Sequence, residues 1–280
     1  MVQIVLGPNG PELMSRHFRV GFQNVHRGIE NANVILEEAV KRDWDVVFIA
    51  EPWVEKKAGG WVTTVQRGFD MVSTLARDTK LVAYVNIKHW QEVEKTKESS
   101  NWCILKVAGQ VLAGVYMSKD WSVKRYGEVA ALFGEYWRRG RKALLVGDWN
   151  AHHQLWGSVN SDGKGKEVKR QLESRGGRWL GITGEPTFRR TSGDHVQESV
   201  LDMAWQGPQD SWQTVEHFWT GSDHKAISFQ VSMEVIQPFE SKIVDWLAVK
   251  AAVEDKDWTP QERKDWWESI PGETAYRNSG

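Results

Sequence analysis

The apolar positions of the chain follow two periods, one typical of helices and one of strands. Helical spacing predicts amphipathic helices over 29–42 and 123–138, and a basic helix over 164–175. Strand-like runs are predicted at 18–23, 45–50, 70–75, 81–87, 102–107, 111–117, 143–146, 185–190, 198–205, 213–218 and 226–231, with a hairpin turn at Gly109. Many strands with a few covering helices predict an α/β fold, a four-layer sandwich of two mainly antiparallel sheets flanked by helices.

The same pattern divides the chain into three parts. Residues 1–17 are predicted to be a loose lead-in, because glycine and proline are frequent there. Residues 18–235 are predicted to form the compact domain. The pattern of strands stops after this domain, and residues 236–280 are charged, with Trp246, Leu247 and Val249 on one helical stripe. We expect this last part to be a helical appendage or linker.

Composition excludes several classes of protein. The chain has 280 residues, 40% of them hydrophobic, which is enough for a substantial core. The single cysteine, Cys103, excludes an intrachain disulfide and a zinc site built on cysteines, and it favours a reducing compartment. No run approaches the roughly 18 apolar residues of a membrane span. The N-terminal residues also lack the order of charges and apolar residues that a secretory signal has.

Charge is nearly balanced overall but not locally. The formal net charge is −1. Residues 164–190 hold eight Lys and Arg against three Glu, which gives this segment +5, and Lys164 and Lys166 begin it. Such a segment suits an anionic substrate, and the alternative is an ordinary solvated helix face.

The most informative stretch for chemistry is Gly147-Asp148-Trp149-Asn150, which follows an apolar strand. Alternation along extended backbone predicts that Asp148 and Asn150 lie on the same side of the sheet edge. An acid able to activate water, beside an amide able to bind a phosphate oxygen, favours metal-assisted phosphodiester hydrolysis. The alternative is a turn that carries Gly, Asp and Asn for conformational reasons.

Other predicted strands also end in groups suited to this chemistry. Glu51 can hold a hard divalent cation through oxygen. His224 can stabilise or protonate a phosphate oxygen, and Asp202, an acid within an apolar strand, can fix its tautomer. Asp223 can provide a second contact to the metal. Each residue also has a structural interpretation: Glu51 as a loop residue, His224 as a structural histidine, and Ser222-Asp223 as a turn or helix cap.

The order and spacing of these groups resemble the endonuclease/exonuclease/phosphatase superfamily, the group around DNase I and the apurinic/apyrimidinic endonucleases. The residues that carry this resemblance over about 18–231 are Asn24, Glu51, Tyr116, 147–150, Thr187, 199–202 and 222–224. A closer similarity is to the endonuclease domain of non-LTR (LINE-type) retrotransposons. Residues 147–158 resemble its motif G-D-x-N-A-H-H-x-x-W-G-S, and residues 50–53 resemble its E-P motif. Residues 116–119 depart from the superfamily, because they lack its proline-rich continuation after the tyrosine.

The resemblance implies a DNase I-like fold and a role for each matching residue. Glu51 would be the main Mg²⁺ ligand, with Mn²⁺ as an alternative metal, and Asn24 and Asp223 would complete the metal site. Asp148 would position the attacking water, with Asn150 beside it. The catalytic set would further include the Asp202–His224 pair, Asp223 orienting His224, and Tyr116 contacting phosphate. His152, His153 and Trp156 are marks of the family for which we expect a structural role.

A second group of residues would contact DNA. Residues 187–199 predict a β-hairpin, which in the resembled family inserts into a DNA groove. Arg189, Arg190 and His195 would then reach phosphates or a minor groove, and the alternative is an ordinary solvated hairpin. The further residues assigned to DNA contact are Thr187, Ser222, Lys164 and Lys166.

These observations lead to one hypothesis for function and two rivals. The resemblance implies a Mg²⁺-dependent endonuclease that nicks double-stranded DNA and leaves a 3′-hydroxyl for target-primed reverse transcription. Its partners would be the target DNA and a reverse transcriptase domain C-terminal in a parent polyprotein, in the nucleus and without a membrane. The first rival is a phosphatase or phosphodiesterase of the same fold, acting on a small or lipid substrate. The second is a non-catalytic binding module, which is disfavoured because every expected catalytic position is occupied.

Overall fold

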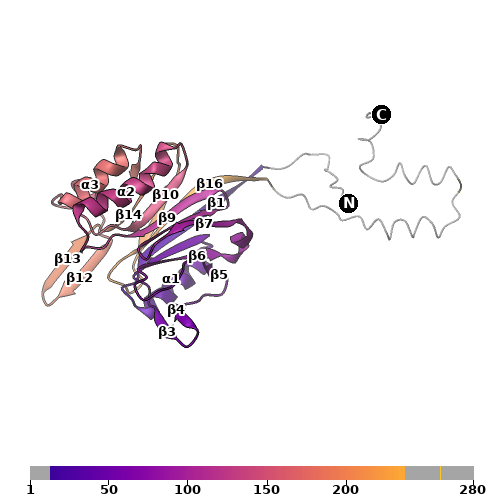
Figure 1. The fold of residues 1–280 in the computed structure, drawn as a ribbon, viewed down its shortest axis with the longest axis horizontal. Helices are drawn as coiled ribbons and strands as arrows, with labels where there is room; N and C mark the ends of the chain where they lie inside the picture. Colours follow the sequence, from indigo (N-terminus) through magenta and orange to yellow (C-terminus); the bar gives the residue numbers. More distant parts are fainter. Residues whose placement is uncertain (1–12, 237–258, 260–280) are drawn as a thin grey trace. The chain divides into compact units, whose positions relative to one another are not determined.

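The structure, a computed structural model, describes residues 13–236 and residue 259. Of the described residues, His17–Ser232 form one compact unit. This unit contains two six-stranded sheets with helices on their outer faces, as Figure 1 shows. No helix among the described residues is long and apolar enough to cross a membrane.

The first sheet carries one helix. Its strands lie in the order β15 (Gln213–Phe218), β16 (Ala226–Ile236), β1 (Leu13–Asn24), β2 (Val46–Ala50), β6 (Leu81–Asn86) and β5 (Phe69–Met71). Helix α1 (Ile29–Lys41) buries Ala32, Ile35, Leu36 and Ala39 against Trp44 and the strand residues beside it. This apolar stripe at helical spacing holds the helix on the sheet.

The second sheet carries two helices. Its order is β11 (Arg178–Leu180), β14 (Asp202–Gln206), β10 (Ala143–Asp148), β9 (Gln110–Tyr116), β8 (Trp102–Val107) and β7 (Val93–Glu98). Helices α2 (Val123–Arg138) and α3 (Gly163–Glu173) pack on it through one shared core. The sheets face each other closely, since a Cβ atom at Gly114 of β9 would come within 2.3 Å of the Phe48 ring of β2. The predicted four-layer sandwich of mainly antiparallel sheets is confirmed.

The central strands of both sheets are covered on their two faces, which explains their continuous apolar sequences. Every residue of β2 and of β10 is buried. β1 runs parallel to β2, and β9 runs parallel to β10. Parallel strands bring their carboxyl ends to one edge of a sheet. Polar residues that end β1, β2, β9 and β10 are therefore collected at the same edge of the sandwich.

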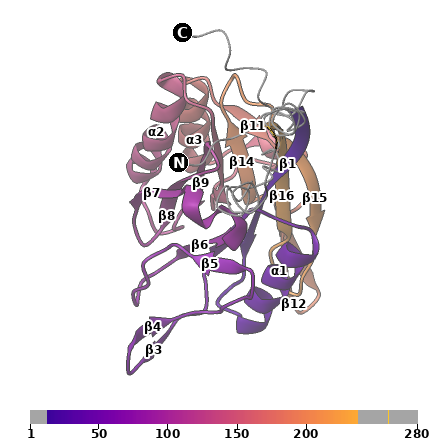
Figure 2. The same cartoon turned by 90° about the vertical axis from the view of Figure 1, so that its right-hand side faces the viewer.

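Two hairpins stand outside these sheets. One is formed by β3 (Glu55–Lys57) and β4 (Gly60–Val62), and the other by β12 (Phe188–Ser192) and β13 (His195–Ser199). Figures 1 and 2 show both hairpins projecting from the lower end of the body. The second is the hairpin that the sequence predicts.

Predictions of secondary structure were best where apolar periodicity was strong. The helices and the strands over 102–107 and 213–218 are confirmed. The single strand predicted over 198–205 is wrong, because β13 ends at Ser199 and β14 begins at Asp202. β1 begins at Leu13, five residues before its predicted start. Strands β3, β4, β7 and β11 contain no buried residue, and the sequence analysis missed them because they lack apolar alternation. The predicted helical stripe at 246–249 lies outside the described residues.

Candidate active site

The predicted catalytic residues meet at the edge where the parallel strands end. Asn24 ends β1, Glu51 follows β2, Tyr116 ends β9 and Asp148 ends β10. Asp148 is paired in register with Tyr116 on one side and with Asp202, the first residue of β14, on the other. The strand ends of two sheets thus form one site.

Asp148 is held by donors from two directions. Its side chain is buried, and its Oδ2 accepts a hydrogen bond of 2.9 Å from Asn24 Nδ2. Its Oδ1 accepts one of 3.1 Å from the backbone N–H of Asn150. Burial and the facing charge of Asp202 raise the pKa of the Asp148 carboxyl above its ordinary value. The group is therefore an unusually strong proton acceptor for a carboxylate.

Asn150 does not share a strand face with Asp148, contrary to what the alternation of the sequence predicts. β10 ends at Asp148, and Asn150 has a left-handed φ of +43°, so the two side chains are not related by strand alternation. Asn150 Nδ2 donates to the carbonyl of Met117 at 3.1 Å. Its backbone carbonyl accepts from Tyr126 Oη at 3.2 Å. Asn150 therefore fixes the turn that holds its own N–H against Asp148.

Asp202 and His224 form a buried pair. Asp202 Oδ2 lies 2.7 Å from His224 Nδ1. Burial lowers the pKa of His224, but the charge and hydrogen bond of Asp202 outweigh it and raise that pKa to about 9. Gln23 Nε2 holds the carbonyl of His224 at 2.9 Å, and the Phe188 ring packs 4.9 Å from the imidazole between ring centroids. The imidazole is therefore fixed in place and protonated at neutral pH.

Thr187 and Ser222 bind the backbone of the site. Thr187 Oγ1, in a buried side chain, accepts from the N–H groups of Leu201 and Asp202 at 3.0 and 2.9 Å. Ser222 Oγ donates to the carbonyl of Asn24 at 2.7 Å and accepts from the N–H of His224 at 3.3 Å. Both residues, predicted to contact DNA, lie in the site and position the groups beside them.

Glu51 and Tyr116 join the two sheets across the site. Glu51 has a left-handed φ of +44°, and its Oε1 accepts a hydrogen bond of 2.8 Å from Tyr116 Oη. His26 Nδ1 lies 3.5 Å from the other oxygen of Glu51. Burial, and then the charge of Glu51, raise the pKa of Tyr116 above its ordinary value. Tyr116 is thus a neutral phenol that donates hydrogen bonds.

The donor set fits a hard divalent cation. One ligand atom each from Asp148, Asp202 and His224 lies within 4.8 Å of the others. Among the described residues, Oδ1 of Asp202 and Oδ1 of Asp223 are buried without a hydrogen-bond partner. Buried carboxylate oxygens with spare acceptor capacity suit Mg²⁺. His224 could join this set only through a neutral ring, since metal binding requires a deprotonated imidazole nitrogen.

The three predicted metal ligands occupy different positions around this cluster. Glu51 accepts from Tyr116, and Asn24 donates to Asp148 through its amide nitrogen. Asp223 accepts from Arg190 Nη2 at 2.9 Å through one oxygen. Glu51 and Asp223 both keep acceptor capacity for a cation, and Asn24 offers its amide oxygen to the N–H of His26.

The predicted DNA-contacting residues lie on two surfaces. Arg189, Arg190 and His195 are exposed on the β12–β13 hairpin. That hairpin is attached to the site, because the N–H of Arg189 donates to the carbonyl of Asp223 at 2.8 Å. Lys164 and Lys166 lie in the first turn of α3, where Lys164 Nζ donates to the carbonyl of Lys119 and Lys166 is exposed.

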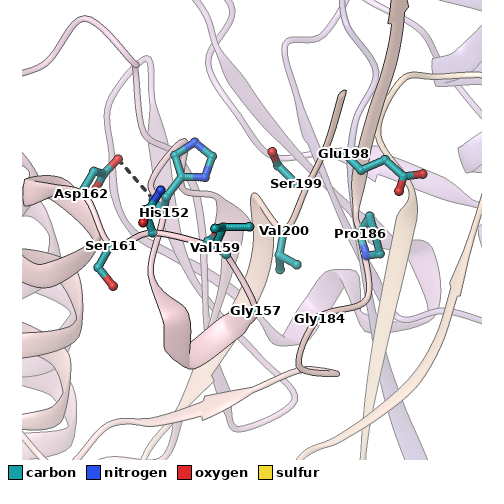
Figure 3. Close-up of a pocket in the computed structure, with 12 residues that line it drawn as sticks. His152, Gly157, Val159, Ser161, Asp162, Gly184, Pro186, Glu198, Ser199 and Val200 are labelled. Atoms are coloured by element: carbon teal, nitrogen blue, oxygen red, sulfur yellow. Dashed lines mark hydrogen bonds between the residues drawn. The ribbon is translucent and has the colours of Figure 1, made fainter. Parts of the chain in front are cut away.

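A cavity of about 480 Å³ lies at the base of the β12–β13 hairpin, lined by Glu198, Ser199 and Val200 among others. Figure 3 shows it between the loop that carries His152 and Asp162 and the base of the β12–β13 hairpin, with Ser199 and Val200. His152 and Gly157, which belong to the motif over 147–158, line the side of the cavity that faces away from the hairpin. Gly157 has a φ of +96°, and a Cβ atom there would come within 2.3 Å of Gly184. Trp156 is buried, with its ring centroid 6.3 Å from that of Trp205.

Several residues of the site were not identified from the sequence. Gln23 is fully buried beside Asn24, and its contact with His224 crosses 201 positions of the chain. Tyr126, in α2, donates to the turn at Asn150. Phe188 contacts His224 from the hairpin. The only available signal was proximity to predicted site residues, which does not separate Gln23 and Phe188 from other neighbours.

Comparisons with known proteins identify related sequences and folds. Residues 112–228 match the family described as endonuclease-reverse transcriptase. A probable RNA-directed DNA polymerase from transposon BS of Drosophila melanogaster is 29% identical over 96 residues, which are 34% of this chain. The match covers only 10% of that polymerase.

Solved structures show the same fold. The endonuclease domain of TRAS1, a telomere-specific non-LTR retrotransposon, aligns with 76% of this chain and 98% of its own, with a TM-score of 0.64 and 22% identity. The catalytic domain of Xenopus laevis APE2 aligns with 80% of this chain and 95% of its own, with a TM-score of 0.56 and 10% identity. The DNase I-like fold is therefore shared at low sequence identity.

Proposed function

We propose that the chain is a Mg²⁺-dependent DNA endonuclease that leaves a 3′-hydroxyl, a proposal supported by the match of residues 112–228 to the family described as endonuclease-reverse transcriptase. One observation carries the proposal. Asp148 and Asp202 face each other across paired strands, and Asp202 holds His224 while keeping a buried oxygen without a hydrogen-bond partner among the described residues. Two buried acids beside an imidazolium suit a phosphodiester and a cation together.

The cation would be held by oxygens of Glu51, Asp202 and Asp223 around this cluster. When bound, Mg²⁺ supplies charge neutralisation at the phosphate and lowers the pKa of water. Asp148 would hold the attacking water and accept its proton, because its pKa is raised while Asn24 and Asn150 fix its two oxygens.

The other side chains would stabilise the developing negative charge on the phosphate. His224, protonated at neutral pH, supplies a positive charge whose direction Asp202 fixes. Tyr116 is a neutral phenol at the same edge and supplies a hydrogen-bond donor. Attack of the water on phosphorus would break the bond to the 3′ oxygen and leave a 5′-phosphate. The leaving 3′ oxygen would take a proton from solvent water and become the 3′-hydroxyl that a polymerase extends.

The proposal also covers the DNA substrate, the compartment and the partner domain. The relative from Drosophila melanogaster is a probable RNA-directed DNA polymerase, and this chain matches a tenth of it. We therefore infer that the nuclease acts on double-stranded DNA in the nucleus. A reverse transcriptase domain, C-terminal in the parent polyprotein, would use the 3′-hydroxyl as its primer.

A plasmid assay tests the proposal. We expect supercoiled DNA to be converted to the nicked circle with Mg²⁺, and not in EDTA or with Asp148→Asn. Asp45→Asn is the matched control, since Asp45 is an equally buried acid that precedes β2, at the end opposite Glu51. Extension of the nick by a DNA polymerase, without prior phosphatase treatment, reports the 3′-hydroxyl. Nicking that is unchanged in EDTA or by Asp148→Asn would refute the mechanism.

A further inference from the structure

We propose that the β3–β4 hairpin is a second DNA-binding arm, which contacts the phosphate backbone on the side of the site opposite β12–β13. The inference rests on the proposed function, since it assumes a DNA duplex at the catalytic edge. β3 begins four residues after Glu51, at the end of the first sheet. The β12–β13 hairpin begins one residue after Thr187 and leads into β14 of the second sheet. One hairpin therefore projects beside the candidate site from each of the two sheets (Figures 1 and 2).

The β3–β4 hairpin is anchored at its root. Thr63 Oγ1 donates to the carbonyl of Trp53 at 2.6 Å and closes the base of the hairpin. Tyr84 of β6 donates from Oη to the carbonyl of Thr64 at 2.7 Å. Three paired residues per strand extend the tip by about 10 Å. An anchored projection presents its tip at a fixed place, which reduces the entropy lost on binding.

Charge favours an anionic partner for this arm. Residues 52–68 contain Lys56, Lys57 and Arg67 against one acid, Glu55. Glu55 pairs with Lys57 at 2.7 Å, and among the described residues Lys56 and Arg67, both exposed, make no ion pair. On β12–β13, by contrast, Arg189 and Arg190 each lie beside an acid. Lys56 on the arm, and Arg67 five residues after β4, therefore need not leave a partner to bind phosphate.

The tip of the arm consists of small residues, and only one of its two glycines is required by the backbone conformation. Gly60 has a φ of +129° and needs to be glycine. Gly59 does not have a left-handed φ, and a Cβ atom there would meet nothing within 4 Å. Glycine at such a position suits the close approach of another molecule to the backbone. Together with Ala58, it leaves room at the tip beside Lys56 and Lys57, which both lie on β3.

Binding of a duplex oligonucleotide in EDTA, followed by fluorescence anisotropy, tests the arm without cleavage. We expect Lys56→Glu with Lys57→Glu to raise the Kd about tenfold or more, and to reduce the slope of log K against log salt by about 1.8. Lys106→Glu with Lys142→Glu is the matched control, with the same charge change at the strand ends far from Tyr116 and Asp148. Equal losses from both pairs, or no loss from the first, would overturn the proposal.

Crosslinking provides a second measurement that does not depend on charge. Cys103 is the only cysteine of the chain and is buried, so Ala58→Cys introduces a single accessible thiol. A photocrosslinker on this thiol should attach to duplex DNA, as should one on Asp194→Cys at the tip of β12–β13. Attachment from Asp194→Cys alone would exclude the second arm. Nicking by the unmodified protein is measured in parallel, and its absence would instead refute the proposed function.

Discussion

The part of the chain that the structure describes contains two buried Asp–His pairs at opposite ends of its strands, and one of them lies in the candidate site. Asp202 Oδ2 and His224 Nδ1 are 2.7 Å apart, and so are Asp45 Oδ1 and His89 Nε2. Asp45 precedes β2, whereas the site lies where β2 ends. The pairs share chemistry and burial, so their surroundings must account for any difference in role.

The Asp45 carboxylate is saturated with donors. Besides His89, it accepts from the N–H of Arg19 at 2.7 Å and pairs with Lys88 Nζ at 3.0 Å. Burial raises the pKa of Asp45, but these hydrogen bonds outweigh burial and lower it. An acid whose charge is fully compensated inside the protein stabilises the fold and has little capacity left for a ligand.

The Asp202 carboxylate is only partly satisfied and faces a second acid. Its Oδ1 is buried without a hydrogen-bond partner among the described residues, and Asp148 is its cross-strand neighbour. Two close carboxylates raise the electrostatic cost of the folded state, a cost that a bound cation removes. The comparison indicates that incomplete compensation of a buried acid, and not the Asp–His pair itself, marks the functional site.

The largest effect expected from this comparison is on nicking. His224→Asn should lower the rate of plasmid nicking about 10³-fold, because it removes a positive charge at the scissile phosphate. His89→Asn should change the rate by less than twofold, since this pair lies at the other end of the strands. Equal losses from the two variants would show that both pairs act only through the fold.

The free energy of unfolding should depend more on the Asp45–His89 pair than on the acids of the candidate site. His89→Ala should lower the free energy of unfolding by about 3 kcal/mol, because it removes the partner of a buried carboxylate. Asp148→Asn, measured in EDTA, should raise it by about 1 kcal/mol by removing repulsion with Asp202. Urea unfolding curves of the three proteins measure both changes. A loss of stability in Asp148→Asn would contradict the view that the site is electrostatically strained.

The support beneath Asp202 can be tested through Thr187. Thr187→Val leaves two buried N–H groups without their acceptor, which should cost about 2 kcal/mol of stability and reduce nicking roughly tenfold. Thr187→Ser keeps the hydroxyl and should restore both. If Thr187→Ser remained as impaired in nicking as Thr187→Val, the hydroxyl would not be the group that matters.

The smallest effect concerns pH. The folded-state pKa of Asp148 is raised above 3.8, so ionised Asp148 destabilises the folded protein increasingly as pH rises from 4 towards neutrality. Over this range, the gain in free energy of unfolding from Asp148→Asn should grow by about 1 kcal/mol. The folded-state pKa of Asp45 is lowered, so its contribution is complete above pH 4 and is lost as pH falls further. Unfolding in EDTA between pH 3 and 7 should therefore show opposite trends for Asp148→Asn and Asp45→Asn. Parallel trends would contradict the assignment.

The sequence predicted the architecture well because buried strands and amphipathic helices leave strong periodic signals. It also placed Glu51, Asp148 and His224 at ends of elements, and the parallel pairing of β1 with β2 and of β9 with β10 then brought those ends together. It did not predict the left-handed turn at Asn150 or the break before Asp202, because two residues of irregular backbone leave no periodic pattern.

The sequence could not show which buried acid is compensated. Asp45 and Asp202 each lie beside an apolar run, and each has its histidine more than 20 positions away. Their difference depends on donors such as the N–H of Arg19, which comes from another strand. Tertiary contacts of this kind are absent from local sequence patterns, so only the assembled fold separates a compensated acid from an uncompensated one.

The most direct test of the central claim is a crystal of the protein soaked in Mn²⁺, with anomalous scattering recorded. The account predicts an anomalous peak at the catalytic edge, within coordination distance of oxygens from Asp202 and Glu51, and none beside Asp45. It also predicts that the peak disappears in Asp202→Asn and persists in His89→Asn. A peak at the Asp45–His89 pair, or no peak at the catalytic edge at saturating Mn²⁺, would contradict it.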